Sequence, residues 1–186
     1  MDKAHVILAR KMDKRSIIPE NQKILLTIGD WKGILNASEM KISIAIALNH
    51  CCGHHRMQLL GYLITDQEVS LIIEGKKLHV DHLLAKFYDE FVSVVADHLS
   101  LADKQGHVLK NWEKHREGAL SDLFDRSIMH DPHLISLLLG QDIDLPYHSA
   151  EAEQLKQQIK TYDFCSAIDY SGAEGPVKVK TKWNKK

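Results

Sequence analysis

Two apolar runs joined by a short polar turn, within residues 57–74, constrain the fold of this chain more than any other feature. Leu, Ile, Val and Tyr dominate both runs, and the segment between them, Thr65-Asp66-Gln67, has the polar composition of a turn. The sequence therefore predicts two adjacent strands, at residues 57–64 and 69–74. Because the side-chain period of a strand is two, Glu68 and Ser70 should project from one side at the start of the second strand.

Hydrophobic spacing and end signals predict the other elements. The clearest is an amphipathic helix at residues 79–101, where apolar residues recur every three or four positions. The Ile-rich run after Asn36 fits a strand by periodicity alone, but its length and alanines favour a helix that ends at Gly53. The predicted helices cover residues 19–31, 36–53, 79–101, 120–130, 133–139 and 149–162, and the further strands cover residues 4–10 and 107–112.

The order strand, helix, strand, strand, helix, strand is that of a split βαβ arrangement. It predicts an α+β protein with a ferredoxin-like βαββαβ antiparallel sheet, helices on one face of the sheet and helical additions at the C-terminus. The other face is expected to be open. We expect a core at residues 1–118, a helical extension of the same domain at 119–174, and a basic tail at 175–186 that is mobile unless bound.

Charge and composition limit the classes of function. The 186 residues include 24 Lys and Arg against 25 Asp and Glu, so any surface that binds nucleic acid must be a local patch. No apolar run is long enough for a signal peptide or a membrane span. The three cysteines, two of them adjacent, do not resemble a secreted disulfide framework. These features predict a cytoplasmic protein without a membrane partner.

Several histidine clusters resemble metal sites by residue type but not by spacing. Residues 49–55 contain two adjacent cysteines and the adjacent His54 and His55, yet neighbouring side chains rarely point at one ion. A packed helix end is the favoured interpretation, with a zinc site as the alternative. The pairs at 79/82 and 130/133 lack a third ligand at a recognisable offset, and we interpret them as solvated. Tyr88 lies within the predicted helix at 79–101, where a packing role is expected.

Basic residues gather in two segments near the chain ends. The first comprises Arg10, Lys11, Lys14 and Arg15. The second comprises Lys178, Lys180, Lys182, Lys185 and Lys186, and Trp183 within it offers a surface on which a base could stack. Solvated ends are the ordinary interpretation of such segments. Together they also form a candidate clamp for a nucleic-acid strand.

Four segments, in order, carry a family resemblance. Residues 61–64, the turn at 66–67 and the apolar positions after it are similar to a family segment that reads approximately Gly-Tyr-Val-Met-Pro-Asn-His-Val-His-Leu-Leu. Residues 5–10 are similar to an opening strand and basic loop, residues 126–133 to a Tyr-Ile-His-x-Asn-Pro stretch, and residues 145–149 to Pro-Trp-Ser-Ser. The chain thus resembles the small single-tyrosine HUH transposases of bacterial insertion sequences, especially the REP-associated branch, over about three quarters of its length.

The resemblance implies a DNA-cutting ancestor whose chemistry is missing here. In the family, two histidines hold a metal that polarises a DNA phosphate, and a tyrosine attacks it to leave a 5′-phosphotyrosine link. Glu68 and Ser70 stand at the histidine positions, and Ser127, with Ile128 as the second choice, stands at the tyrosine position. Without imidazole ligands or a phenol, we expect no catalytic residues, no cofactor and no resident metal.

The expected function is therefore binding of single-stranded or hairpin DNA across the open sheet face and basic loop, without strand cleavage. The expected contacts are Arg10, Lys11, Lys14, Arg15, Lys180, Lys182 and Trp183. The family also implies a homodimer.

Two alternatives remain. One is an active nuclease with an altered site, in which Glu68 and His54 or His55 bind magnesium or manganese and Tyr88 is the nucleophile. The other is a domesticated interaction module whose sheet face binds a protein or a second copy of the chain.

Overall fold

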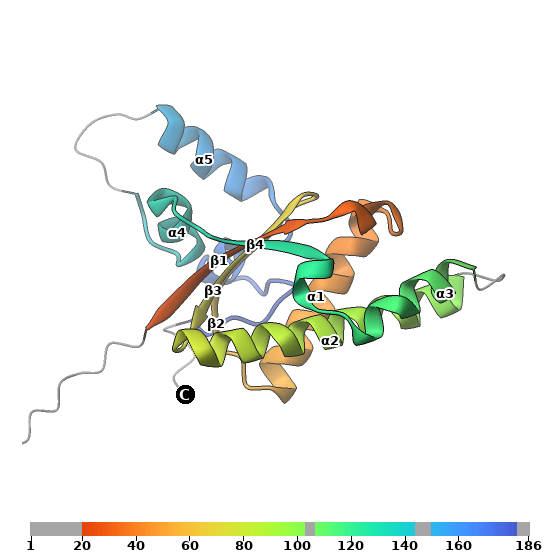
Figure 1. Ribbon diagram of the computed structural model, residues 1–186. Helices are drawn as coiled ribbons and strands as arrows, with labels where there is room; N and C mark the ends of the chain where they lie inside the picture. Colours follow the sequence, from red (N-terminus) through yellow and green to blue (C-terminus); the bar gives the residue numbers. More distant parts are fainter. Residues whose placement is uncertain (1–19, 103–106, 144–149, 182–186) are drawn as a thin grey trace, which may run out of the picture.

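The computed structural model describes residues 20–102, 107–143 and 150–181 (Figure 1). At its centre is an antiparallel sheet with the strand order β2-β3-β1-β4. The strands are β1 (Asn21–Ile28), β2 (Leu59–Ile64), β3 (Glu68–Glu74) and β4 (Phe124–Ile128). The predicted α+β class is confirmed, as is the strand pair predicted within residues 57–74.

Two long helices, α1 (Ala37–His54) and α2 (Lys77–Ala102), pack against each other and cover one face of the sheet. Both confirm predicted helices. α1 begins with a capping box, in which the Asn36 side chain accepts from the Glu39 N–H and the Glu39 carboxylate accepts from the Asn36 N–H. α1 ends at His54, one residue past Gly53, so the end predicted around residues 50–53 is confirmed to within one residue. Arg56, just beyond, has the left-handed φ of 56° that closes many helices.

The main core lies between this face and the two long helices. On β3, Val69, Leu71 and Ile73 alternate into it, as the period of a strand requires. Near α3 (His107–Glu113) the core is aromatic, with ring contacts among Trp31, Phe87, Phe91, Trp112 and Phe124. The indole N–H of Trp112 donates to the Val92 carbonyl at 2.9 Å, so this buried polar group has a partner.

α3 stands where a strand was predicted at residues 107–112, so that prediction is wrong. Leu109 and Trp112, three positions apart, both pack on the main core, whereas Val108 is exposed. This is helical rather than alternating spacing. Three short 3₁₀ helices lie nearby in the chain: η1 (Asp30–Gly33), η2 (Lys114–Glu117) and η3 (Leu120–Asp122).

β1 occupies residues that were predicted to form a helix. Ile24, Leu25 and Ile28 fit a helical face, but Ile24, Leu26 and Ile28 also alternate, and these last three are the buried ones. A short apolar run satisfies both periods, and tertiary pairing with β3 and β4 selects the strand. The strand predicted at residues 4–10 lies outside the described residues.

β4 replaces the helix predicted at residues 120–130, which is therefore wrong. Phe124 is buried, but the other four residues of β4 are exposed, so this edge strand has little alternation for a sequence to reveal. The next two predicted helices are confirmed within their described residues by α4 (Pro132–Leu138) and α5 (Ala150–Thr161).

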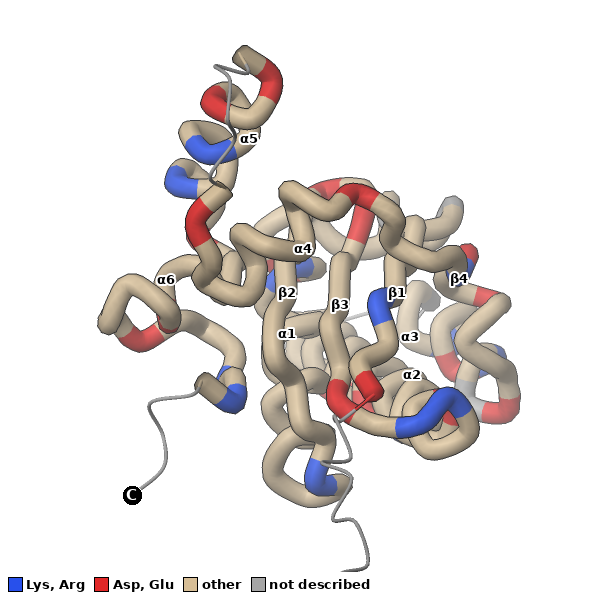
Figure 2. Tube along the Cα trace, turned by 90° about the vertical axis from the view of Figure 1, so that its left-hand side faces the viewer, with Lys and Arg blue, Asp and Glu red and all other residues tan. Residues whose placement is uncertain are grey.

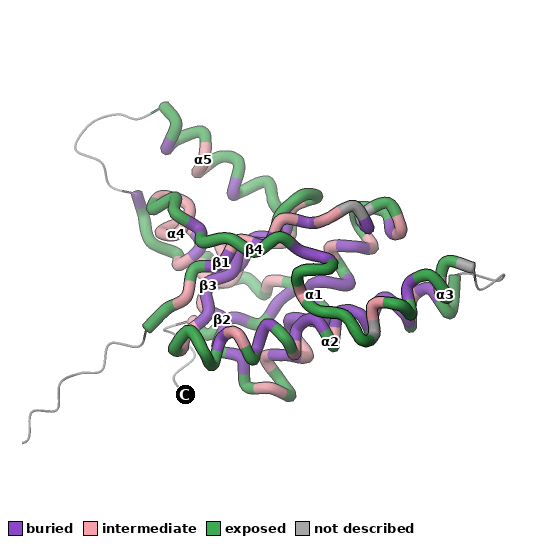
Figure 3. The backbone as a smooth tube through the Cα atoms, in the orientation of Figure 1, coloured by how far each residue is buried: buried purple, intermediate pink, exposed green. Residues whose placement is uncertain are grey.

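A second, smaller core covers the other face of the sheet over β2 and β3. It is built by α4, α5 and residues next to α6 (Ala167–Tyr170), with the buried members Leu63, Ile72, Met129, Leu138, Ile159 and Cys165. The backbone of α4 approaches β2 at Gly61, where a Cβ would lie 2.6 Å from the Leu138 carbonyl oxygen. The expectation of helices on one face and an open second face is therefore wrong. Figure 3 shows that β4 keeps most of its length exposed.

The segment 164–180 runs along the outer edge of β2. Val177 and Val179 within it are buried in the main core. Three backbone bonds join the segment to the strand: Ile64 N–H to Phe164 O (2.9 Å), Ser166 N–H to Tyr62 O (2.9 Å) and Lys180 N–H to Leu59 O (2.7 Å). The tail predicted to be mobile from residue 175 is thus packed as far as its described part extends, to residue 181.

The sheet and the two cores therefore include residues both from the predicted core at 1–118 and from the predicted helical extension at 119–174. β4 comes from residues 119–174, which were expected to add only helices to a core at 1–118. Among the described residues, no helix has both the length and the apolar character needed to cross a bilayer.

Candidate nucleic-acid interface

Glu68 and Ser70 lie on the sheet face that carries the second core. Ser70 is 4% exposed and pairs with Leu25 on β1 and Leu63 on β2. Glu68 is exposed at the start of β3, beside Thr27. One buried hydroxyl and one exposed carboxylate supply at most one good ligand for a hard cation.

Ser127 lies on β4, and not on a helix as the sequence predicted. Its pairing partner is Leu25, which also pairs with Ser70, so the two serines flank Leu25 in one row of the sheet. Two strand spacings separate their Cα atoms by about 10 Å. The hydroxyl of Ser127 is thus exposed, but it lies too far from the hydroxyl of Ser70 for both to act on one phosphate.

Tyr88, the alternative nucleophile, is 1% exposed in the main core. Its hydroxyl donates to the His115 carbonyl oxygen at 2.6 Å. Burial raises the pKa of Tyr88, and the charges of Asp122 and Asp89 raise it further. Both the enclosure and the direction of the pKa oppose formation of a phenolate at this position.

His54 and His55 lie at the end of α1, where Glu90 of α2 organises the histidines. His50 Nδ1 and His55 Nε2 lie 3.0 and 3.1 Å from the two carboxylate oxygens of Glu90. Burial acts to raise the pKa of Glu90, but the hydrogen bonds to these imidazoles outweigh it and leave the pKa below its ordinary range. His54 is exposed. The cluster ties α1 to α2.

This cluster does not meet Glu68. Met57, just after α1, donates its N–H to Cys51, and β2 then begins beside the end of β3. Glu68 is at the opposite end of β3, a distance of about 20 Å along a seven-residue strand. Among residues 20–102, 107–143 and 150–181, no group of three or more His, Cys, Asp or Glu side chains is arranged to hold a metal.

Positive charge gathers at one end of the sheet, where β1 and β2 begin, β3 ends and α2 begins. We call this the basic end, and its exposed members are Lys23, Arg56, Lys76, Lys77 and Lys178. None of the five forms an ion pair with another described residue. In Figure 2 the lower end of the sheet and the turn into α2 carry Lys and Arg, with Asp or Glu beside them. Glu20 and Glu74 lie at this end, and Glu74 is paired with Lys180.

Negative charge gathers at the other end of the same sheet. Glu68 and Asp125 are exposed and flank Thr27 from the two neighbouring strands. Asp66, in the turn between β2 and β3, is exposed and bonded to Lys41 at 2.7 Å. Figure 2 shows Asp and Glu in this upper turn. The sheet is thus polarised along its strands, and an anionic ligand is attracted to the basic end only.

Both predicted basic segments attach at the basic end. Gly75, at the end of β3, donates its N–H to the Glu20 carbonyl at 2.7 Å. Lys180 Nζ lies 2.7 Å from Glu74 Oε2, one residue before Gly75. Arg10, Lys11, Lys14, Arg15, Lys182 and Trp183 lie outside the described residues.

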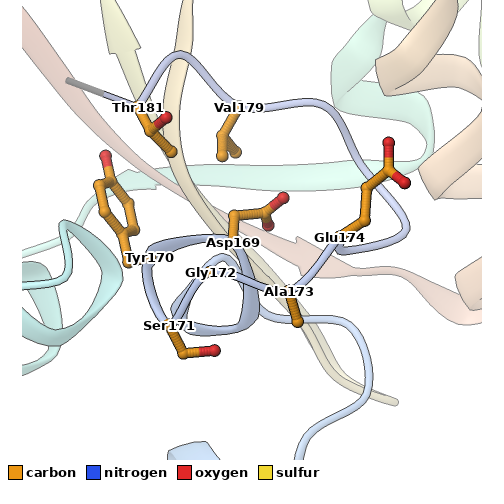
Figure 4. Close-up of a pocket in the computed structure, with 8 residues that line it drawn as sticks. All are labelled: Asp169, Tyr170, Ser171, Gly172, Ala173, Glu174, Val179 and Thr181. Carbon is orange, nitrogen blue, oxygen red and sulfur yellow. The ribbon is translucent and has the colours of Figure 1, made fainter. Parts of the chain in front are cut away.

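A cavity of about 680 Å³ lies beside α6 (Figure 4). Its lining includes the carboxylates of Asp169 and Glu174. Burial raises the pKa of Asp169, whose Oδ1 accepts from the Gly175 N–H at 3.1 Å while Oδ2 is buried without a hydrogen-bond partner. Two carboxylates repel a phosphate, so this cavity does not extend the basic end.

Comparisons with protein-family models, with curated proteins and with solved structures find no match to this chain.

Sequence reasoning identified the two basic segments but missed the fixed part of the basic end. Lys76 and Lys77 were visible as an adjacent pair after Gly75, at the predicted end of a strand. Lys23 and Arg56 gave no signal, because their proximity to that pair depends on how β1, β2 and β3 align.

Proposed function

We propose that this protein binds single-stranded or hairpin DNA and does not cleave it. The observation that supports this most is the attachment of both predicted basic segments at the basic end, beside Glu74 and Gly75. A DNA strand bound at the basic end can contact both segments at once. Effective concentration then adds to the affinity of each segment.

We also propose that the fold is ferredoxin-like and related to the HUH transposases. The strand order β2-β3-β1-β4 supports this, as does the placement of α1 between β1 and β2 and of α2 between β3 and β4. α3 and the short 3₁₀ helices before β4 are additions to that plan. By the same relationship we propose a homodimer. A cytoplasmic setting is supported by Cys51, Cys52 and Cys165, which are all free thiols.

The absence of cleavage in this proposal is supported by the site positions. The exposed Glu68 and the buried Ser70 offer no pair of imidazoles to hold a Lewis-acid metal. Ser127 is an alcohol on an edge strand, with the apolar side chains of Leu25 and Met129 as neighbours in the sheet. The nuclease alternative requires Tyr88 as the nucleophile, and its hydroxyl is already bonded within the core.

Fluorescence anisotropy with labelled single-stranded and hairpin oligonucleotides tests binding. The wild-type chain should bind both, with an affinity that falls steeply as salt rises. Replacing Arg10, Lys11, Lys14 and Arg15 with Ala should weaken binding and flatten the salt dependence. Unchanged affinity in this variant would contradict the role of the first segment. Absence of binding at low salt would leave the interaction-module alternative.

Incubation of hairpin DNA with manganese tests the cleavage part of the proposal. Denaturing electrophoresis should show intact DNA and no covalent protein–DNA adduct. An adduct that disappears in Tyr88→Phe would establish the nuclease alternative instead.

A further inference from the structure

We propose that the basic end is a fixed phosphate-binding surface, and that DNA lies there and not across the sheet face. This inference rests on the proposed function and assigns contacts that the sequence did not suggest. The new contacts are Lys23, Arg56, Lys76 and Lys77, and they lie with Lys178 of the second basic segment at the basic end.

The exposure of these five side chains, without ion-pair partners among the described residues, is the first support. All five are exposed, and none has an ion-pair partner among the described residues. Several other surface cations are paired, since Lys41, Lys86 and Arg126 lie against Asp66, Asp89 and Asp81. An unpaired ammonium or guanidinium can release a counterion from DNA without first breaking a bond inside the protein.

The polarity of the sheet is the second support. A DNA strand that lies along the exposed part of the second face, over β1 and β4, would contact Glu68 and Asp125 on either side of Thr27. Both carboxylates are exposed and repel phosphates. The side chains that β1 and β4 present on this strip include no aromatic ring on which bases could stack. They are the exposed Lys23, Asp125 and Ser127 and the half-buried Leu25 and Thr27. Binding is therefore favoured at the end and disfavoured on the face.

The points at which the described chain leads into the two basic segments are the third support. They lie beside Glu74 and Gly75, which immediately precede Lys76 and Lys77. Strand pairing places the start of β1 next to the end of β3, with Asn21 opposite Glu74 and Lys23 opposite Ile72. The fixed lysines thus lie beside both attachment points.

Contacts of this kind go to phosphates, so they carry no base information. The ligand of the basic end is therefore the sugar-phosphate backbone, and its binding should depend on salt concentration and DNA length more than on base sequence.

The test compares two triple variants with equal changes in charge. The basic-end variant is Lys23→Ala/Lys76→Ala/Lys77→Ala. The matched control is Lys110→Ala/Lys114→Ala/Lys160→Ala, which removes three exposed lysines, also without ion pairs to described residues, from α3, η2 and α5. Anisotropy is measured on a labelled single strand of about 20 nucleotides, long enough to exceed one binding site. Salt is varied from about 50 to about 200 mM.

We expect the basic-end variant to bind about tenfold or more weakly than the control at low salt, with the slope of log affinity against log salt reduced by about 2. The control should stay within about twofold of wild type after correction for net charge. Circular dichroism and urea unfolding should be unchanged for both variants. Lys23→Arg/Lys76→Arg/Lys77→Arg should bind like the wild type.

Equal affinities and slopes for the two alanine variants would overturn the inference while leaving the proposed function intact, provided that the wild-type chain binds DNA. Failure of the wild-type chain to bind DNA would instead overturn both. Retention on vesicles containing phosphatidylserine, in the absence of DNA binding, would assign the basic end to a lipid surface and also overturn both.

Discussion

Lys180 Nζ lies 2.7 Å from Glu74 Oε2, and this ion pair joins the C-terminal segment to the end of β3 at the basic end. The side chains are 48% and 24% exposed, so solvent screens the attraction and the pair contributes at most about 1 kcal/mol to stability. Its larger effect is on charge, because Glu74 neutralises one lysine where phosphates are proposed to bind.

Glu74→Gln should therefore leave urea unfolding almost unchanged and increase DNA affinity about two- to threefold at low salt, since Lys180 is released from its partner. Anisotropy titration measures the gain, and Glu151→Gln on the exposed start of α5 serves as a charge-matched control. A loss of affinity in Glu74→Gln would show that the pair is needed to position the C-terminal segment.

Tyr88→Phe should destabilise the fold by about 0.5–1.5 kcal/mol, because it removes the hydrogen bond from the Tyr88 hydroxyl to the His115 carbonyl, which keeps only the Gly118 N–H as a donor. DNA affinity of the folded variant should not change. Urea unfolding gives the free-energy difference, with Tyr162→Phe as the control, since that ring lies at the surface. A fully stable Tyr88→Phe variant that has lost DNA binding would point to a functional hydroxyl.

Acidification should weaken the junction between α1 and α2 at Glu90. Because the pKa of Glu90 is lower in the folded protein than in the unfolded chain, the unfolded state binds its proton first. The stabilisation is thus fully present above the ordinary glutamate range near pH ~4.3 and is lost as pH falls through the lowered value. Glu90→Gln should remove this dependence. Urea midpoints of the two proteins should differ at pH 7 and converge as pH falls through the lowered pKa of Glu90; parallel curves would contradict the assignment.

Gly61→Ala should destabilise the packing of α4 on β2 by about 1–3 kcal/mol, because the added Cβ would meet the Leu138 backbone at 2.6 Å. Gly53→Ala is the matched control. It lies within α1 with nothing inside 4 Å, so it should stabilise the helix by up to about 1 kcal/mol. Thermal or urea unfolding measures both changes. Equal effects would mean that α4 can move away from β2 at little cost.

Part of the fold could be predicted because its signals are local. The turn at residues 65–67 and the apolar runs beside it define β2 and β3, and the spacing of Val80, Leu84 and Phe87 defines a helical face for α2. β1 and β4 were not predicted as strands, and the reasons are physical. β1 satisfies two periods at once, and β4 is an exposed edge strand whose conformation is imposed by its bonds to β1.

The candidate interface divides in the same way. The sequence by itself determined the two basic segments, the missing imidazoles at Glu68 and Ser70, and a net charge near zero that requires any anion-binding surface to be local. Only the tertiary structure decided that Glu20 and Lys180, from which the chain leads into those segments, lie at one end of the sheet, and which further cations lie there. Lys23, Arg56 and Lys76 are distant in the chain, and they share one end of the molecule because antiparallel pairing places the start of β1 and of β2 beside the end of β3. Strand register is a long-range property, set by which faces can be buried, and no local pattern contains it.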